Sequence, residues 1–184
     1  MPIFYKFEKN YKYSEVWYND KIDHFIGIIC PKHDGHRRCG RNANMNLSIE
    51  IKKKKFGDFI STVYSDWLIT DKVVKMFQKH NLKGYEIKPV DVCNMTLPFN
   101  LWEFIVTGKG GEAHPYSGIV KTYHCKYCNR TKYRAFKNGT GIVVDESNWD
   151  GSDFFTITAY PKFVLVNEKV KSIIEENDFK GVLL

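Results

Sequence analysis

The chain has 184 residues, of which 43% are hydrophobic and 15% aromatic, so it can bury a core of ordinary size without disulfide bonds. Its net charge of +7 favours solubility and is compatible with an acidic partner, although charge alone does not identify one. No low-complexity tract and no run of 18 apolar residues is present, which argues against a disordered chain and against a membrane-spanning helix.

The N-terminal stretch MPIFYKFEKNYKYSE lacks an apolar run of signal-peptide length, so we expect a cytoplasmic protein that does not bind membranes. Five cysteines follow along the chain, at positions 30, 39, 93, 125 and 128. In a reducing compartment, these are expected as free thiols or metal ligands and not as a disulfide framework.

The segment CPKHDGHRRCG at 30–40 contains the first candidate metal-binding turn. Cys30 and His33 have the spacing of a Cys-x-x-Cys turn, with an imidazole in place of the second thiolate, and a turn-forming Asp-Gly pair follows them. His36 and Cys39 lie within reach, and either could replace His33 as the ligand.

A run of four lysines, Lys52 to Lys55, follows the cluster formed by Arg37, Arg38 and Arg41. Together these residues could form a basic patch that contacts phosphate groups. The alternative is that the lysines lie on the exposed edge of a hairpin, where their charge discourages edge-to-edge association.

Two helical segments, 68–87 and 165–184, follow the same pattern 97 residues apart. In both, an apolar pair precedes a candidate N-cap, Thr70 or Asn167, and an acidic residue comes next, where the helix dipole favours negative charge. Apolar residues then mark one helical face, and a glycine, Gly84 or Gly181, is expected in the left-handed conformation that ends the helix.

The similarity between the halves extends toward the N-terminus. Asp58 and Asp153 lie 95 residues apart in similar GDFI and SDFF segments, as do Cys30 and Cys125. Any two capped strand–helix–strand units would share part of this pattern, but the common offset favours two pseudo-repeated halves. We therefore predict an α+β fold with mixed or antiparallel sheets and one main helix in each half.

The glycine-rich segment TGKGGEAHP at 107–115 lacks the spacing of a phosphate-binding P-loop and is predicted to be a flexible connection. It places the N-terminal half at residues 1–106 and the C-terminal half at 107–184, within one compact domain. We expect a monomer or a weak dimer.

The sequence CKYC at 125–128 supplies the second candidate metal-binding turn. Cys30, His33, Cys125 and Cys128 together form a Cys₃His set of the kind that binds structural Zn²⁺, which would join the two halves as a pair of zinc knuckles. The alternatives are a metal-free pair of turns or a redox role for the CKYC thiols.

Two further segments combine tryptophan with acidic residues. VYSDWLIT at 63–70 contains Asp66 and Trp67, and DESNWDGSDFF at 145–155 contains Trp149, Asp150 and Asp153. These five residues are candidate contacts for a protein partner, because aromatic residues are enriched at interface hot spots. A structural role for both tryptophans is the alternative, and acid–base catalysis by the second segment is not favoured, since no nucleophile lies at a recognisable spacing.

The segments CPKHDGHRR, SDWLITDKVVKMFQKHNLKGYEIKPV, LWEFIVTGKGG, CKYC and DESNWDGSDFF, with PKFVLVNEKV after them, together resemble the double-CXXCG-motif family. The resemblance covers most of residues 24–184. This chain departs from the family pattern by having His33 in the first motif and Asn129 after the second. The resemblance implies a bacterial protein, and some members look like immunity proteins encoded beside polymorphic, contact-dependent toxins.

We therefore expect a non-enzymatic, cytoplasmic immunity protein that binds and neutralises a cognate toxin domain and carries a structural zinc ion. No catalytic triad, His-Glu-x-x-His motif or dinucleotide fingerprint is present in the sequence. The alternative function is a zinc-stabilised nucleic-acid-binding module that uses the lysine run and the arginine cluster.

Overall fold

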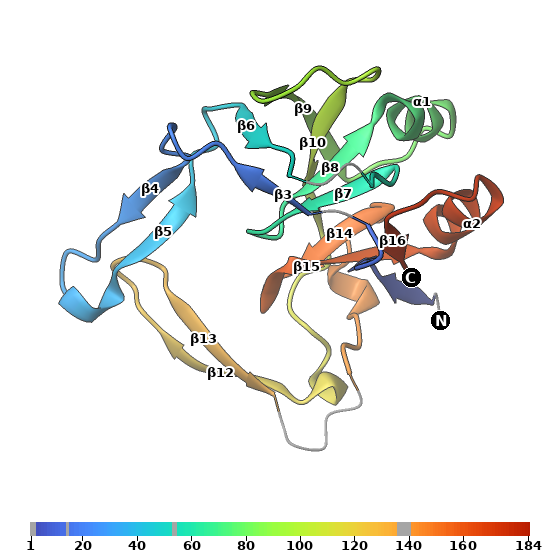
Figure 1. Cartoon of the computed structure of the whole chain (residues 1–184). Helices are drawn as coiled ribbons and strands as arrows, with labels where there is room; N and C mark the ends of the chain where they lie inside the picture. The colour runs from blue at the N-terminus through green and yellow to red at the C-terminus, as the bar shows by residue number, and fades with distance from the viewer. Residues whose placement is uncertain (1–2, 14, 53–54, 136–140) are drawn as a thin grey trace.

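The computed structural model describes residues 3–13, 15–52, 55–135 and 141–184, and strands dominate this part of the chain (Figure 1). The strands are β1 (Phe4–Lys6), β2 (Glu8–Lys9), β3 (Glu15–Tyr18), β4 (Phe25–Ile28), β5 (Arg38–Arg41), β6 (Leu47–Glu50), β7 (Phe59–Thr62), β8 (Trp67–Thr70), β9 (Tyr85–Val92), β10 (Leu101–Val106), β11 (Gly108–Lys109), β12 (Ile119–His124), β13 (Thr131–Ala135), β14 (Phe154–Ile157), β15 (Tyr160–Asn167) and β16 (Val182–Leu183). The helices are α1 (Asp71–Lys79) and α2 (Glu168–Glu176), with short 3₁₀ turns at η1 (Asp34–His36), η2 (Pro115–Ser117) and η3 (Glu146–Asn148).

The strands form a closed barrel, a second sheet and three two-stranded ribbons. The barrel has the order β10-β8-β7-β3-β6-β9, and the second sheet has the order β1-β15-β14-β11. Both contain parallel and antiparallel pairs, whereas the ribbons β4–β5, β12–β13 and β2–β16 are antiparallel. The predicted combination of helices with mixed and antiparallel sheets is therefore confirmed.

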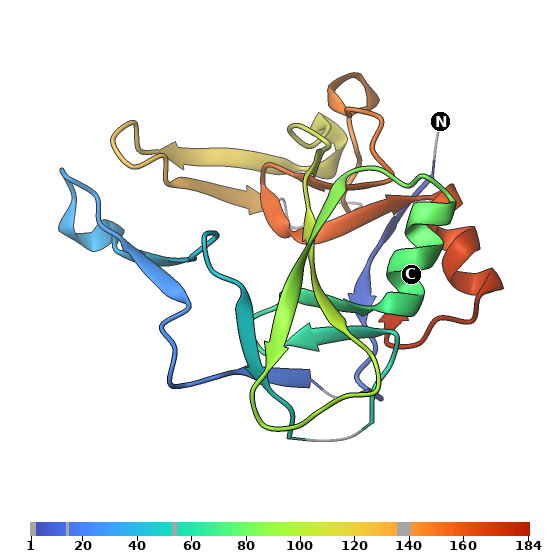
Figure 2. The same cartoon turned by 90° about the horizontal axis from the view of Figure 1, so that it is seen from above.

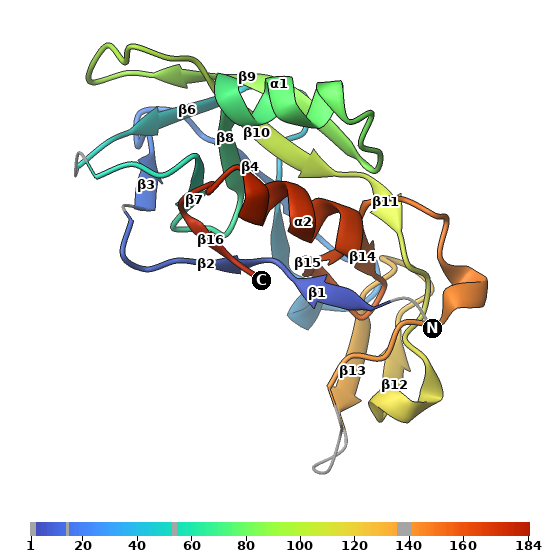
Figure 3. The same ribbon diagram turned by 90° about the vertical axis from the view of Figure 1, so that its right-hand side faces the viewer.

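The two helices lie side by side on one side of the molecule (Figure 3). Each begins with an acidic residue, and the Asn167 side chain accepts a hydrogen bond from the Val170 amide, whereas the Thr70 side chain makes no such bond. Asn81 and Asp178, each with φ of +50°, adopt the left-handed conformation just after the helices. The prediction that Gly84 and Gly181 end the helices is therefore wrong: both glycines have positive φ, but each lies three residues farther along the chain. Within the described residues, neither helix combines the length and apolar character needed to cross a membrane.

The main core lies between the helices and the two sheets. Its aromatic centre is formed by Phe59, Phe77 and Phe154, each with no exposed surface, and apolar residues of both helices pack around it. A second cluster lies inside the barrel and includes Val16, Leu47 and Leu68. Burial of these side chains is the main source of stability for the body of the molecule, at roughly 1.5–3 kcal/mol for each large residue.

Several contacts between distant segments occur twice. Phe4 of β1 pairs with Asn167 at the end of β15, and Leu101 of β10 pairs with Thr70 at the end of β8. The Tyr5 hydroxyl donates to the carboxylate of Glu168, and Trp102 Nε1 donates to Asp71 Oδ1 at 2.8 Å. In both cases an aromatic side chain of one strand holds the first residue of a helix.

The carboxylates of Asp58 and Asp153 make a second set of paired contacts. Asp58 Oδ2 accepts from the Lys180 amide at 2.8 Å, and Asp153 Oδ2 accepts from the Lys83 amide at 2.7 Å. Asp58 therefore contacts the chain just after α2, and Asp153 contacts the chain just after α1, so each aspartate binds near the helix that is more distant from it in sequence.

Candidate metal centre

Two hairpins extend from the body and meet at their tips (Figures 1 and 2). We call residues 25–41, which contain β4 and β5, the first arm, and residues 119–135, which contain β12 and β13, the second arm. The turn at the tip of the first arm contains Cys30, His33 and His36, and the turn at the tip of the second contains Cys125 and Cys128. The two predicted knuckle turns are thus brought together in space.

The tips place four candidate ligand atoms within 4.8 Å of one another, from Cys30, His33, His36 and Cys125. The Cys30 and Cys125 sulfur atoms are 3.8 Å apart. His33 Nδ1 lies 3.5 Å from the Cys30 sulfur and 3.6 Å from the Cys125 sulfur. The Cys128 sulfur adjoins the same group, 3.7 Å from His36 Nδ1.

These separations match the edges of a metal-centred tetrahedron. With metal–sulfur bonds of about 2.3 Å and metal–nitrogen bonds of about 2.0–2.1 Å, two sulfur ligands are about 3.8 Å apart and a sulfur and a nitrogen about 3.6 Å. Both tips are also exposed loops with no large apolar core of their own to hold them together. The residues present therefore fit a metal ion, and the cluster could bind one.

The local electrostatics favour thiolates at Cys125 and Cys30. Burial alone would raise the pKa of the Cys125 thiol, but hydrogen bonds from the backbone amides of Cys128 and Tyr127 lower it to about 5. Burial likewise opposes ionisation of Cys30, yet the Lys32 amide and the His33 side chain bring its pKa below the ordinary value. Burial raises the pKa of Cys128. Since the thiolate is the metal-binding form, the lowered pKa values of Cys125 and Cys30 favour both sulfur atoms as ligands.

Reciprocal hydrogen bonds connect the two tips beside the sulfur atoms. Arg38 Nη2 donates to the carbonyl of Cys128 at 2.8 Å, and Arg130 Nη1 donates to the carbonyl of Gly35 at 3.0 Å. Cys39 was an alternative metal ligand on sequence grounds. It is exposed in β5 opposite Gly27 and lies outside the cluster of candidate ligands formed by Cys30, His33, His36 and Cys125.

The five candidate partner contacts lie away from the arms' tips, and two of them are enclosed. Trp67 is only 7% exposed and packs edge-to-face on Phe7, with 4.8 Å between the ring centres. Asp153 is also 7% exposed and accepts from Lys83 and from Asn167 Nδ2. Side chains in these positions support the fold, so a partner would meet them only after rearrangement.

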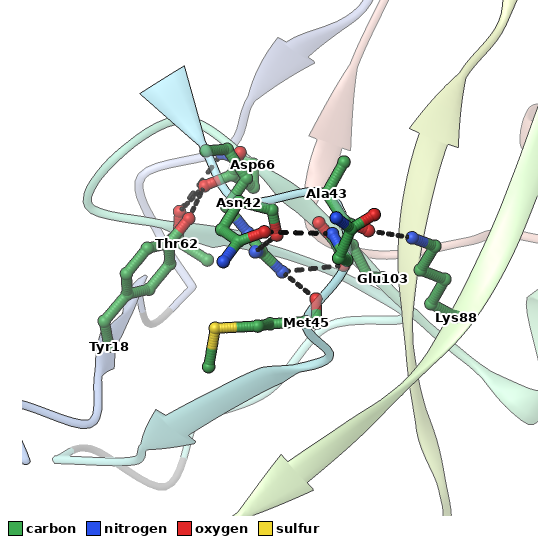
Figure 4. A network of polar contacts seen from close by, with 10 residues as sticks. Tyr18, Asn42, Ala43, Met45, Thr62, Asp66, Lys88 and Glu103 are labelled. Atoms are coloured by element: carbon green, nitrogen blue, oxygen red, sulfur yellow. Dashed lines mark hydrogen bonds and ion pairs between the residues drawn. The ribbon is translucent and has the colours of Figure 1, made fainter. Parts of the chain in front are cut away.

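The other three candidates are partly accessible but have structural partners. The Asp66 carboxylate accepts from the hydroxyls of Tyr18 and Thr62 (Figure 4). Asp150 accepts from the backbone amides of Lys109 and Ser152 at 2.8 and 3.0 Å. Trp149 Nε1 donates to the Ser152 carbonyl at 3.1 Å, and its ring packs on Phe4, so this residue fits the structural alternative.

Sequence reasoning missed a polar network at the base of the first arm. Glu103, 5% exposed, accepts from Arg41 at 3.3 Å, and Lys88 contacts the carbonyl of Ala43 (Figure 4). Burial raises the pKa of Glu103 above its usual range, and the neighbouring Arg41 opposes that effect. These residues line a cavity of about 270 Å³. The signal available in the sequence was the isolated acidic residue in the apolar strand LWEF.

Comparison with known proteins gives no direct guide to function. No protein-family model matches the chain, and no curated protein is significantly similar to it.

Proposed function

We propose that the chain is a non-enzymatic immunity protein whose two arms are joined by a structural Zn²⁺ ion. The observation that carries the metal-joined arms is the convergence of five Cys and His side chains from two turns about 95 residues apart. A site filled by protein ligands leaves no open position for substrate, which favours a structural role for the metal. Zinc is preferred because mixed thiolate and imidazole ligands at tetrahedral spacing suit it.

The proposed ligands are Cys30, His33, Cys125 and Cys128. His33 is favoured over His36 because its Nδ1 lies 3.5 Å from the Cys30 sulfur and 3.6 Å from the Cys125 sulfur, whereas His36 Nδ1 lies 3.7 Å from the Cys128 sulfur. In this arrangement three thiolates and one imidazole bind the ion. His36 remains beside Cys128, where it can donate a hydrogen bond to the sulfur.

Elemental analysis of chelator-free protein is expected to give about one zinc ion per chain. His33→Ala should lose most of the bound zinc at low metal concentration, because it removes one of four ligands. His36→Ala is the matched control and should retain close to one equivalent. If His33→Ala retains its zinc while His36→Ala loses it, His36 and not His33 is the fourth ligand. Absence of zinc from the unmodified protein would contradict the metal site.

We also propose that the two halves are pseudo-equivalent and exchange segments. The paired contacts support this: Phe4 and Leu101, like Asn167 and Thr70, are 97 residues apart, and each pairing joins one half to the other when the second half is taken to begin at Leu101. The same relation connects Tyr5–Glu168 with Trp102–Asp71. On this basis the second unit begins with β10, near residue 101, a few residues before the boundary after residue 106 that the sequence favoured.

The immunity role rests on the motif resemblance and on the rigid two-armed shape that the metal would maintain. The partner would be a toxin domain, with the chain acting in the cytoplasm of the cell that makes it. Asp66 and Asp150 remain proposed contacts, together with the exposed part of Trp149, whereas Trp67 and Asp153 act from the interior.

Co-expression with a toxin domain encoded beside this gene is expected to restore growth and to yield a complex that co-purifies. Growth arrest despite full expression of the chain would contradict the immunity role. A variant lacking the metal, Cys30→Ser with Cys125→Ser, serves as the control: if the metal keeps the arms in their binding shape, rescue should weaken even though the body remains folded.

A further inference from the structure

The excess positive charge of the chain is concentrated on the two arms. The first arm has four basic residues and one acidic residue, and the second has five basic residues and no acidic residue. The arms therefore have an excess of eight positive charges, whereas the whole chain has a net charge of +7. Even with three thiolates and one Zn²⁺ ion, which together contribute a single negative charge, the arms stay strongly basic. The rest of the molecule is close to neutral.

Most of these cations are available to a partner. Among the described residues, Arg41 is the only arm cation in an ion pair, with Glu103 at the base of the first arm. Arg38 Nη2 and Arg130 Nη1 donate to carbonyl groups across the tips, and neither guanidinium is paired with a carboxylate among the described residues. The remaining basic side chains are exposed: Lys32, Arg37, Lys121, Lys126, Lys132 and Arg134.

Exposed tyrosines lie between these cations. Tyr127, 48% exposed, has the ammonium groups of Lys126 and Lys32 at 5.4 and 5.9 Å from its ring centre. Tyr123, 37% exposed, is directly opposite Lys132 in the ladder and 5.9 Å from its ammonium group. Tyr127 therefore keeps about half of its surface open to solvent and Tyr123 somewhat more than a third, and the Tyr123 ring also packs edge-to-face on His36, with 5.6 Å between the ring centres.

The strand register places part of this set on one face of the second arm. Val120 pairs with Arg134, and Tyr123 pairs with Lys132, so the four side chains belong to two cross-strand pairs. Because Lys132 and Arg134 are two residues apart in a strand, their side chains point to the same side. The face thus combines two cations with an exposed ring and an exposed aliphatic side chain.

We propose that the two arms form a binding surface for single-stranded nucleic acid. Lysine and arginine side chains that lack carboxylate partners attract phosphates, and exposed aromatic rings stack on unpaired bases. A duplex offers no free base faces to Tyr123 and Tyr127, and an acidic protein would use the cations without the rings. The helices, which could otherwise enter a major groove, lie on the side of the body away from the arms (Figure 1). This activity goes beyond toxin binding and does not depend on it.

Binding is tested by fluorescence anisotropy with zinc-loaded protein and a labelled single strand of twelve thymidines. With about five phosphates neutralised, raising the salt concentration from 50 to 150 mM should weaken binding roughly 50-fold. A duplex of the same length should bind at least about fivefold more weakly than the single strand, since stacking contributes about 1–3 kcal/mol per base.

Two matched pairs of variants locate the surface. Lys132→Glu with Arg134→Glu should weaken binding at least about tenfold, because both phosphate contacts become repulsive. Lys75→Glu with Lys79→Glu makes the same change in net charge on α1 and should alter binding less than about twofold. Tyr127→Ala should weaken binding at least about fivefold, whereas Tyr127→Phe should retain it.

Three outcomes would overturn the proposal: no binding at 50 mM salt, equal binding of single strand and duplex, or equal losses in the arm and helix charge variants. Competition by a polyglutamate peptide as effective as that of the single strand would assign the surface to acidic proteins instead. Zinc content and thermal melting of each variant separate loss of the surface from loss of the fold. The growth-rescue assay is independent, so failure of either function is distinguishable from failure of the other.

Discussion

Cys125→Ser is expected to lower the free energy of unfolding by several kcal/mol, on the order of 3–5 kcal/mol, when zinc is present. The sulfur of Cys125 is within tetrahedral-edge distance of both Cys30 and His33, so its removal takes away a ligand that connects the two arms. Metal binding that requires the folded arrangement contributes directly to the free energy of folding. Chemical denaturation of the zinc-loaded proteins, followed by circular dichroism, measures the difference.

The loss of stability caused by Cys125→Ser should appear first in the two arms. The main apolar clusters lie in the body, so residues 25–41 and 119–135 depend most on the connection at their tips. Hydrogen exchange should therefore accelerate in these two segments before the body opens. Cys93→Ser, at an exposed cysteine outside the cluster, is the control and should change stability by less than about 0.5 kcal/mol. Identical melting of the Cys125 and Cys93 variants would reject the metal connection.

The features predicted correctly from the sequence depend on local chemistry. Both helices were expected from an N-cap, an acidic first residue and a 3.6-residue apolar period, and all three signals lie within a few residues of each other. The two turns whose Cys and His side chains meet in the cluster, which could bind a metal, were likewise visible from short spacings, such as that between Cys30 and His33. Interactions between neighbours along the chain are the part of a fold that one sequence displays directly.

The features that were missed depend on partners far away in the chain. Nothing near Phe4 indicates that β1 would pair with β15, and nothing near Glu103 indicates Arg41 as its partner. The tips also contain more candidate ligands than one metal needs, so spacing alone left His33 and His36 unresolved. Trp67 was predicted as a partner contact because tryptophan is common at interfaces. Its side chain is instead buried against Phe7, a residue about sixty positions earlier in the sequence, and no neighbouring residue indicates this contact.

Gly181→Ala and Gly84→Ala are each expected to destabilise the protein by at least about 3 kcal/mol. Both glycines have positive φ, +99° and +91°, where a side chain costs roughly 1–2 kcal/mol. A methyl group at Gly181 would also lie 1.9 Å from the Phe59 carbonyl oxygen, and one at Gly84 would lie 2.1 Å from that of Phe154. The backbone in both places must move, which disturbs strands β7 and β14 beside the main core. Denaturation midpoints measure both losses.

Two other glycines separate the cost of conformation from that of the clash. Gly151 has φ of +79° with no neighbour within 4 Å of an added methyl group, so Gly151→Ala should show the conformational cost alone, about 1 kcal/mol. Gly27, in an open position of β4 without positive φ, should tolerate alanine with little change. If the halves are pseudo-equivalent, the losses at Gly84 and Gly181 should be similar and well above the Gly151 value. If Gly84→Ala or Gly181→Ala lowers the free energy of unfolding no more than Gly151→Ala does, the backbone carbonyl next to that glycine can shift to accept the methyl group. That result would contradict the equivalent close packing proposed for the two halves.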